Sequence, residues 1–238
     1  MTPWSEEWRL DRLQLLYDEW ADCERCKLCN GRQNIVFGEG SIETDLMFIG
    51  EGPGEEEDKC GDPFVGGSGQ LLEDLFDRVG INRSEVFLTN LVMCRPPSNR
   101  DPTKLESDSC APRLYEQIRI VNPLLIIPIG KVAMKVLMKG DWKSILDNQH
   151  GHGQLGKLKI PAVQHVEDIV YDAMPIIHPA FILRADSIDP STGTWPEDGY
   201  CHQTIQDLTS ALDWVQFLKK QYRKTRDAFH GHPALKVQ

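Results

Sequence analysis

The chain has no run of about 18 or more apolar residues, so it offers no candidate for a helix that spans a bilayer. Its N-terminus lacks the basic region followed by an apolar stretch that marks a secretory signal. We therefore expect a cytoplasmic protein without a membrane association. Positive charge is also scarce, since 26 lysines and arginines face 36 aspartates and glutamates. The formal net charge of -10 argues against non-specific adhesion to nucleic acid, which needs local positive potential, although a small basic face would suffice for a specific complex.

The length of 238 residues and the 40% of hydrophobic residues allow one sizeable core. We expect a monomer with a single domain over residues 1–238. Its parts would be an N-terminal helix with a cysteine pair (1–32), a sheet that carries the site (33–184), and a loop followed by a C-terminal helix (185–238).

Four of the seven cysteines have a spacing typical of a soft-metal site, a C-x-x-C pair followed by two single cysteines with fifteen residues between them. The four are Cys23, Cys26, Cys94 and Cys110. An odd number of cysteines does not suit a disulfide framework, and reducing surroundings favour metal binding. Four thiolates suit either an iron-sulfur cluster or tetrahedral zinc, and either centre would clamp distant segments together. Cys29 is close enough in sequence to be an alternative ligand, whereas Cys60 and Cys201 are left over.

Apolar runs alternate with helical periodicity along the chain, which is typical of an α/β fold. Short apolar runs predict strands at 45–50, 86–89, 124–129 and 174–177. Apolar residues at three- and four-residue steps predict helices at 4–21, 68–79, 106–121, 131–138 and 204–222. Strands separated by helices imply a parallel sheet with helices on both faces. Residues 140–172 show only short irregular strands, and 186–200 is typical of a surface loop.

Polar residues follow the predicted strands at the points where the strands end. Glu51 follows the first strand, Asn90 the second, Gly130 the third and His178 the fourth. In open parallel sheets, ligands bind outside the carboxyl ends of the strands. We therefore expect three polar side chains from distant parts of the chain to converge on one edge of the sheet.

With these positions set out, the chain resembles the iron-sulfur branch of the uracil-DNA glycosylase superfamily, also called family four. The resemblance runs through most of the chain as an ordered series of short motifs. They are Cys23-x-x-Cys26-x-Leu28 with Arg32, Gly50-Glu-Gly-Pro-Gly-Glu-Glu-Glu-Asp58, Pro63-Phe-Val-Gly66, Thr89-Asn90, Cys94-Arg-Pro-Pro97 with Asn99-Arg100, Glu106 with Cys110, and His178-Pro179 with Leu183-Arg184. One such motif alone would be weak evidence, but their order and the cysteine spacing make chance agreement improbable.

This resemblance implies a three-layer α/β/α fold with a short four-stranded parallel sheet. It also implies a 4Fe-4S cluster on Cys23, Cys26, Cys94 and Cys110, and so favours iron over zinc. The implied activity is a base-excision repair reaction on single- or double-stranded DNA, in which the bond between uracil and deoxyribose is hydrolysed, leaving an abasic site. A base inside a duplex must first be flipped out of the stack. We expect a structural role for the cluster, since hydrolysis involves no electron transfer.

The resemblance also assigns roles in binding uracil. Phe64 would stack on the flipped ring, and the Asn90 amide would match its N3–H and O4. Cytosine presents the opposite donor and acceptor, so a fixed amide would face two mispaired groups at about 1 to 3 kcal/mol each. His178 is placed to donate a hydrogen bond to O2 of the departing uracil anion. Either protonation state of the imidazole allows this donation.

The water molecule must approach the sugar from the face opposite the base, and Glu51 is the candidate that orients it or accepts its proton. Related branches place an aspartate one position later, where this chain has Gly52. The alternative is that Glu51 and the Gly52 backbone contact uracil while main-chain groups hold the water. Glu57 resembles a family glutamate that braces the pocket. Gly54 stands where those branches carry a tyrosine that blocks thymine, so another wall has to exclude thymine here.

Five residues are candidates for contact with DNA: Arg100, Phe181, Ile182, Leu183 and Arg184. One of the three apolar side chains would wedge into the gap left by the flipped nucleotide, with Arg184 on a phosphate. Two rival functions stay open on the same fold. One is a catalytically weak or inactive DNA-binding module of replication, and the other is a relative that traps the abasic sugar covalently. Relatives of the second kind carry a histidine-containing insertion after the second strand, and residues 95–100 contain no histidine.

Overall fold

A computed structural model describes the chain except residues 1–4, 139–143, 148–150, 162–167, 190 and 226–238. Its strands are β1 Glu39–Gly40, β2 Leu46–Gly50, β3 Phe87–Asn90, β4 Leu125–Pro128, β5 Gly156–Ile160 and β6 Ile169–Ala173. Its α-helices are α1 Glu6–Trp20, α2 Glu55–Cys60, α3 Gly67–Val79, α4 Lys104–Val121, α5 Gly130–Leu137, α6 Pro179–Ala185 and α7 Tyr200–Thr225. Short 3-10 turns are η1 Lys27–Asn30, η2 Arg83–Glu85 and η3 Pro97–Asn99. Within the described part, every helix is too short or too polar to cross a membrane.

The strands form one sheet in the order β1-β3-β2-β4-β6-β5. The four inner strands β3, β2, β4 and β6 run parallel, whereas the edge strands β1 and β5 are antiparallel to their neighbours. Every residue of β2, β3 and β4 is buried, as expected of parallel strands that are covered on both faces. The predicted α/β class is therefore confirmed, but the four-stranded parallel sheet is corrected to a mixed sheet of six strands among the described residues.

The fourth parallel strand is β6, not the predicted strand at 174–177. That segment continues from β6 and stays beside β4, since the Met174 and Ile176 amides donate to the carbonyls of Ile126 and Pro128. Pro175 has no amide hydrogen to extend a regular ladder. Buried and more exposed residues alternate along β6, so it lacks the continuous apolar run that marked the other parallel strands.

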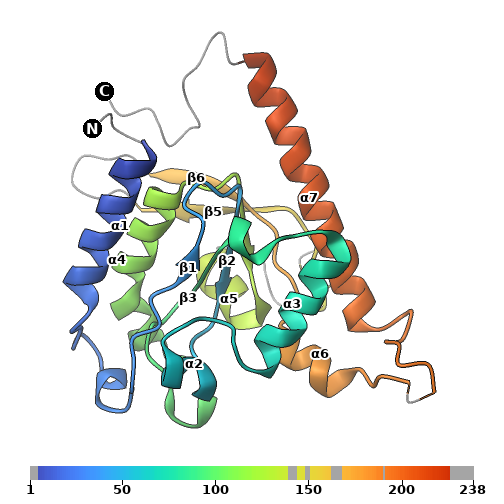
Figure 1. Cartoon of the computed structure of the whole chain (residues 1–238), viewed down its shortest axis with the longest axis horizontal. Coiled ribbons are helices and arrows are strands. Elements are labelled where there is room, and N and C mark those ends of the chain that lie inside the picture. Colours follow the sequence, from blue (N-terminus) through green and yellow to red (C-terminus); the bar gives the residue numbers. More distant parts are fainter. Residues whose placement is uncertain (1–4, 139–143, 148–150, 162–167, 190, 226–238) are drawn as a thin grey trace.

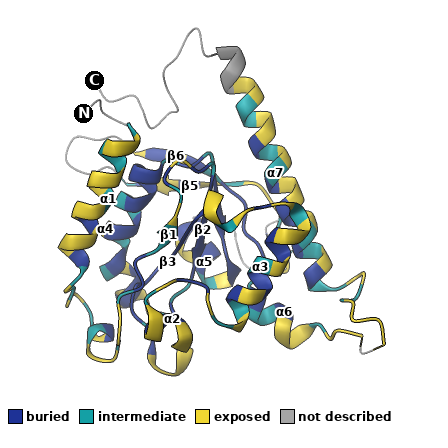
Figure 2. Cartoon of the chain, viewed as in Figure 1, coloured by how far each residue is buried: buried dark blue, intermediate teal, exposed yellow. Residues whose placement is uncertain are grey.

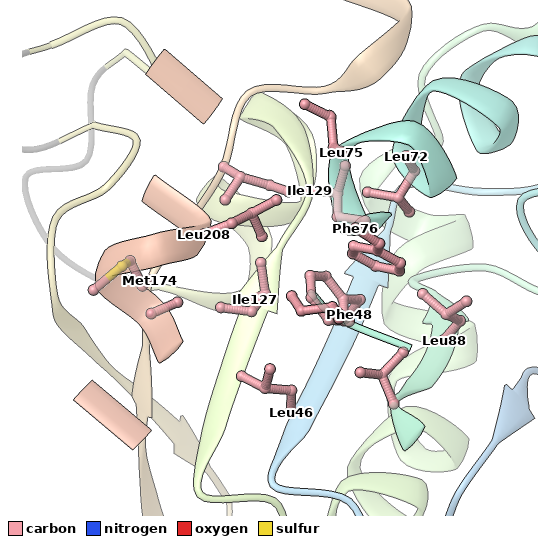
Figure 3. Close-up of a cluster of buried hydrophobic side chains, with 14 of the residues drawn as sticks. Leu46, Phe48, Leu72, Leu75, Phe76, Leu88, Ile127, Ile129, Met174 and Leu208 are labelled. Atoms are coloured by element: carbon pink, nitrogen blue, oxygen red, sulfur yellow. The ribbon is translucent and has the colours of Figure 1, made fainter. Parts of the chain in front are cut away.

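Helices cover both faces of the sheet, which gives three layers (Figure 1). On one face α3, α6 and α7 pack over β2, β3 and β4, and Figure 3 shows Phe48 of β2 against Phe76 of α3. The centroids of these two rings are 4.8 Å apart. On the other face α4 and α5 pack over the same strands and over β5 and β6, and α1 lies against α4. Figure 2 shows the buried strands between helices whose outer faces are exposed. The three layers are those that the family resemblance implied.

Two helix starts determine the surroundings of the pocket described below. Thr103 and Glu106 form a reciprocal capping box at the start of α4, which fixes the end of the proline-rich loop 95–102. His178 is the N-cap of α6, and Pro179 takes the first helical position, where its missing amide hydrogen costs nothing. The six-residue α2 and seven-residue α6 are too short to show helical periodicity, so the sequence pattern did not predict them.

Candidate active site

A pocket of about 620 Å³ lies at the carboxyl ends of the parallel strands. Glu51, Asn90, Gly130 and His178 all line it, so the predicted convergence on one edge of the sheet is confirmed. Other residues that the sequence singled out also line it, namely Gly52, Gly54, Glu57, Phe64, Arg100, Phe181 and Arg184. The pocket therefore collects polar and aromatic groups from segments that are far apart in sequence.

The amide of Asn90 and the ring of Phe64 meet above Gly50, the last residue of β2. A Cβ atom at Gly50 would lie 2.4 Å from Asn90 Oδ1 and 2.6 Å from Phe64 Cζ, so only glycine fits between them. Asn90 is 3% exposed, and within the described part of the chain its side-chain amide has no hydrogen-bond partner, which leaves it free for a ligand. Phe64 has a φ of 55°, a left-handed conformation that is rare for a bulky residue and is typical of functional sites.

The structure determines which ring nitrogen of His178 can donate. Nδ1 accepts a hydrogen bond of 3.1 Å from the Ala180 amide, so the proton of a neutral ring is on Nε2. Burial, joined by the charge of Arg184, lowers the pKa of His178 to about 4. The imidazole is therefore neutral at pH 7, with an Nε2–H group as its donor.

Glu51 lies beside His178, across Gly130. A Cβ atom at Gly130 would lie 2.9 Å from His178 Cβ and 3.0 Å from Glu51 Oε1, and its φ of +87° also requires glycine. The Val132 amide donates to Glu51 Oε1 at 3.4 Å. Burial raises the pKa of Glu51 to about 7, and the negative charge of Asp101 contributes to this rise as the second cause. This carboxyl group therefore changes protonation near neutral pH, where a general base is most effective.

Replacing Glu51 with glutamine tests this carboxyl group through the pH dependence of activity. If the ionised form is the active one, the single-turnover rate of the reaction expected from the family resemblance rises with pH and levels off above about pH 7, because deprotonation populates the carboxylate. The Glu51→Gln variant should be slower by about a hundredfold and show no inflection near pH 7. An inflection that survives in the variant would assign it to another group.

Glu57 ties together two loops of the pocket. Its Oε2 accepts from the Gly54 amide at 3.0 Å, while Oε1 accepts from the amides of Val65 at 3.0 Å and Gly66 at 2.8 Å. A Cβ atom at Gly54 would lie 2.5 Å from Glu57 Oε2. The carboxylate therefore fills the space that a side chain at position 54 would need.

Removing this carboxylate should destabilise the fold. Glu57→Ala leaves three backbone amides without their acceptor, and we expect the free energy of unfolding to fall by about 2 kcal/mol or more. Glu56→Ala is the matched control, because Glu56 is exposed and pairs only with Lys59 among the described residues. The control should stay within about 0.5 kcal/mol of the unaltered chain in urea unfolding. Equal midpoints for the two variants would contradict the bracing role.

The four cysteines with the soft-metal spacing come together at one end of the molecule. Cys26, Cys94 and Cys110 form a small apolar cluster with Leu28 and Val92, and Cys23 packs against the adjoining cluster. All seven cysteines are free thiols. Burial raises the pKa of the Cys94 thiol to about 11, and Arg32 donates to its Sγ at 3.5 Å. Among the described residues, no three His, Cys, Asp or Glu side chains are arranged to hold a metal ion.

Two of the remaining cysteines lie elsewhere, since Cys60 is exposed at the end of α2 and Cys201 is buried in the core beside α3 and α6. Cys29 stays next to the group, because its amide donates to the Cys26 carbonyl at 3.3 Å, and its thiol contacts Asn30 Oδ1. The four cysteines that the spacing selected therefore lie in adjoining clusters, with Cys29 beside them.

The candidate DNA-contacting residues differ in whether their side chains are exposed and in whether they already contact other residues. Ile182 is 0% exposed in the core, because the turn of α6 directs it inward, so its assignment as a wedge is wrong. Leu183 is 46% exposed, and Arg184 is exposed at the pocket. The Phe181 ring rests edge-on against Tyr200, with centroids 5.1 Å apart. Arg100 makes a two-pronged ion pair with Glu106, at 2.7 and 2.8 Å.

Sequence reasoning missed several residues of the pocket. Asp101 lines it and raises the pKa values of both Glu51 and His178, and its only sequence signal is its position after the Asn99-Arg100 motif. Lys131 and 144–146 also line it, although 140–172 carried no motif. Outside the pocket lining, Arg113, a buried arginine on α4, was also missed, since its only signal was its place three residues after Cys110.

The fold and the pocket define an α/β protein with polar and aromatic side chains gathered at the carboxyl edge of its sheet. Residues 37–197 match the family model of the uracil DNA glycosylase superfamily. The chain is 40% identical over 178 residues to a type-4 uracil-DNA glycosylase of Pyrobaculum aerophilum, covering 74% of this chain and 87% of that protein. It is 38% identical over 177 residues to one of Thermotoga maritima, covering 74% and 85%. The chain belongs to the uracil-DNA glycosylase superfamily, in its type-4 branch.

Proposed function

We propose that this protein is a DNA repair glycosylase that flips uracil out of DNA and hydrolyses its N-glycosidic bond, leaving an abasic site. The observation that carries the proposal is the meeting of Asn90, Phe64, His178 and Glu51 in one pocket. The relatives named type-4 uracil-DNA glycosylase support it. An aromatic face, an amide and a neutral N–H donor are the groups that a flipped pyrimidine needs.

Uracil recognition is assigned to Asn90 and Phe64. The unpaired Asn90 amide offers an acceptor for N3–H and a donor for O4, and its burial makes any mispaired group costly. The Phe64 ring next to it supplies the stacking surface. Glu57 closes the space beside Gly54, so we assign exclusion of the thymine methyl group to that wall.

Bond cleavage builds negative charge on uracil and positive charge on the sugar. The neutral Nε2–H of His178 donates to O2 of the departing base, an oxyanion-type stabilisation. Glu51 on the other side of Gly130 is placed to orient the water or accept its proton when ionised. Gly52 contributes its backbone to the pocket floor, where a Cβ atom would lie 2.7 Å from Val92.

We assign the four-cysteine site to a 4Fe-4S cluster and not to zinc, because the cysteine spacing resembles that of the iron-sulfur branch and the relatives are type-4 enzymes. A single zinc ion would draw the four sulfur atoms to within about 2.3 Å of one point. In a cluster, Cys23, Cys26, Cys94 and Cys110 would each bind a different iron atom, so the thiolates are held farther apart. When bound, the cluster would cross-link these segments, and we assign it no part in the hydrolysis. Brown colour and iron in the purified protein would support it, and zinc alone would contradict it.

On the DNA side, we assign Leu183 and Phe181 to the gap left by the flipped nucleotide. Arg184, exposed beside them, is assigned to a phosphate. Arg100 would have to share its ion pair with Glu106 to bind a second phosphate. We further propose that residues 1–238 form a single domain that acts as a monomer in the cytoplasm.

The test is incubation with uracil-containing oligonucleotides, single- and double-stranded, with free uracil as the readout. Release of uracil with an alkali-sensitive abasic product supports the proposal. No release under any condition would favour the inactive DNA-binding module. A protein–DNA adduct that survives a denaturing gel would instead favour covalent trapping of the sugar.

A further inference from the structure

Arg113 of α4 is a buried cation whose protein partners are all neutral. It is 0% exposed. Its Nη1 donates to Thr89 Oγ1 at 3.1 Å and to Gln117 Oε1 at 2.6 Å, and its Nη2 donates to the carbonyls of Asn90 at 2.9 Å and Leu91 at 3.1 Å. Its Nε has no hydrogen-bond partner, and no carboxylate pairs with it in the described part of the chain.

A buried guanidinium without a counter-charge is strongly destabilising. The thiols of Cys110, Cys94 and Cys23 are groups close enough to act on its charge if they lose their protons. Cys110 lies three residues earlier on α4, one turn away on the same side of the helix. With a cluster bound, its four thiolates would leave net negative charge at this end of the fold. The negative charge of the cysteine site would therefore lie close to Arg113 and supply the counter-charge that this arginine lacks.

The other side of the same guanidinium fixes the end of β3. Asn90 and Leu91 are successive residues at the carboxyl end of that strand, and Nη2 holds both of their carbonyls. Thr89 and Gln117 extend the clamp, since both also donate to the Phe37 carbonyl, at 3.0 and 2.9 Å. The buried guanidinium of Arg113 thus fixes the position of the backbone at Asn90, whose side-chain amide is assigned to uracil.

We propose that Arg113 is a positioning residue that couples the cysteine-bound cluster to uracil recognition. Its charge offsets the thiolates, and its Nη2 holds the carbonyl of Asn90 so that the amide faces the pocket. The inference rests on the cluster and on the role of Asn90 proposed above. Because coupling between two sites is reciprocal, loss of the cluster should weaken uracil binding. Loss of the hydrogen bonds from the Arg113 guanidinium to the Asn90 and Leu91 carbonyls should weaken it as well, even with the cluster still present.

Two variants separate the charge of Arg113 from its geometry. Arg113→Lys keeps the positive charge but replaces the planar fork by one nitrogen, whereas Arg113→Met removes both. Arg119→Met is the matched control, a buried arginine on the same helix that bonds the Pro161 carbonyl and pairs with Glu116 instead. The full-length proteins are compared for iron content, cluster midpoint potential, inhibition by free uracil, and binding of a uracil-free oligonucleotide.

We expect Arg113→Lys to retain iron and the midpoint potential but to bind free uracil about tenfold more weakly, with unchanged affinity for uracil-free DNA. Arg113→Met should in addition shift the potential to more negative values or lose iron faster to a chelator, because the charge that favours the reduced cluster is gone. Arg119→Met should leave uracil binding, the midpoint potential and the rate of iron loss unchanged.

Unchanged uracil inhibition in Arg113→Lys would overturn the proposal, as would a potential and iron-loss rate in Arg113→Met equal to those of Arg119→Met. If Arg113→Met does not fold, Arg113→Lys carries the test. Absence of iron from the unaltered protein is a different result, since it would refute the cluster itself.

Discussion

His178→Ala should lower kcat for uracil release by about 10²- to 10³-fold, the usual cost of removing one donor from a developing oxyanion. The reason is the arrangement at the start of α6, where the Ala180 amide occupies Nδ1 and leaves Nε2–H as the donor to the base. Substrate binding should change far less than kcat, because the hydrogen bond strengthens as charge develops on uracil. Single-turnover rates at saturating enzyme measure this step directly.

Alanine at position 178 also removes the N-cap of α6, which alone costs about 1 kcal/mol. His178→Asn separates the two effects, since asparagine is a good N-cap but its side chain is too short to reach as the imidazole does. We expect normal stability and the same loss of rate. His202→Ala, at an exposed site on α7, should behave as the unaltered chain. A His178→Asn variant with full activity would remove the histidine from the mechanism.

The pH dependence follows from the same environment. The pKa of His178 is lowered to about 4, so the ring stays neutral throughout the neutral range and contributes no inflection there. An inflection near pH 6.5 that disappears in His178→Asn would show instead that the imidazolium is the donor.

Asn90→Ala should reduce kcat/KM for uracil by about a hundredfold or more, because two hydrogen bonds in a buried site are lost together. Asn90→Asp gives a sharper test of base reading. An aspartate has no N–H for O4 of uracil, whereas its protonated form offers cytosine a donor for N3 and an acceptor for N4–H. The ratio of uracil to cytosine release should therefore fall by about tenfold or more.

Asn82→Asp is the matched control for these variants, since Asn82 lies on the surface and uses only its side-chain oxygen to cap η2. That oxygen is retained in aspartate, so both rate and base preference should be unchanged. If Asn90→Asp discriminated between the two bases as the unaltered chain does, the amide would not be the reading group.

The inner sheet and most of the pocket could be predicted because each depends on a local signal with a general rule behind it. Continuous apolar runs identified β2, β3 and β4, and strand ends located Glu51, Asn90 and Gly130 without any knowledge of the family. His178 lies at the predicted edge of the sheet because 174–177 runs beside β4, although it makes a single parallel bridge, Ile176 to Ile129, and not a full strand.

The rest depends on contacts between distant residues, which a sequence pattern does not contain. Which nitrogen of His178 carries the proton depends on the Ala180 amide two residues away and on burial by other segments. Ile182 and Leu183 are apolar and adjacent in sequence. Only the turn of α6 places the side chain of Ile182 in the core and that of Leu183 on the surface. Arg113 reads as an ordinary helix residue until α4 is packed against β3.

The antiparallel strand β5 has a further consequence for the behaviour of the protein in solution. It closes the outer side of the sheet with the sequence Gly-Lys-Leu-Lys-Ile, in which Lys157 and Lys159 are exposed and pair with Asp172 and Asp168. Lysines on a border strand oppose the docking of another strand, because their charges would have to be desolvated. The fold thus carries its own protection against aggregation by strand addition.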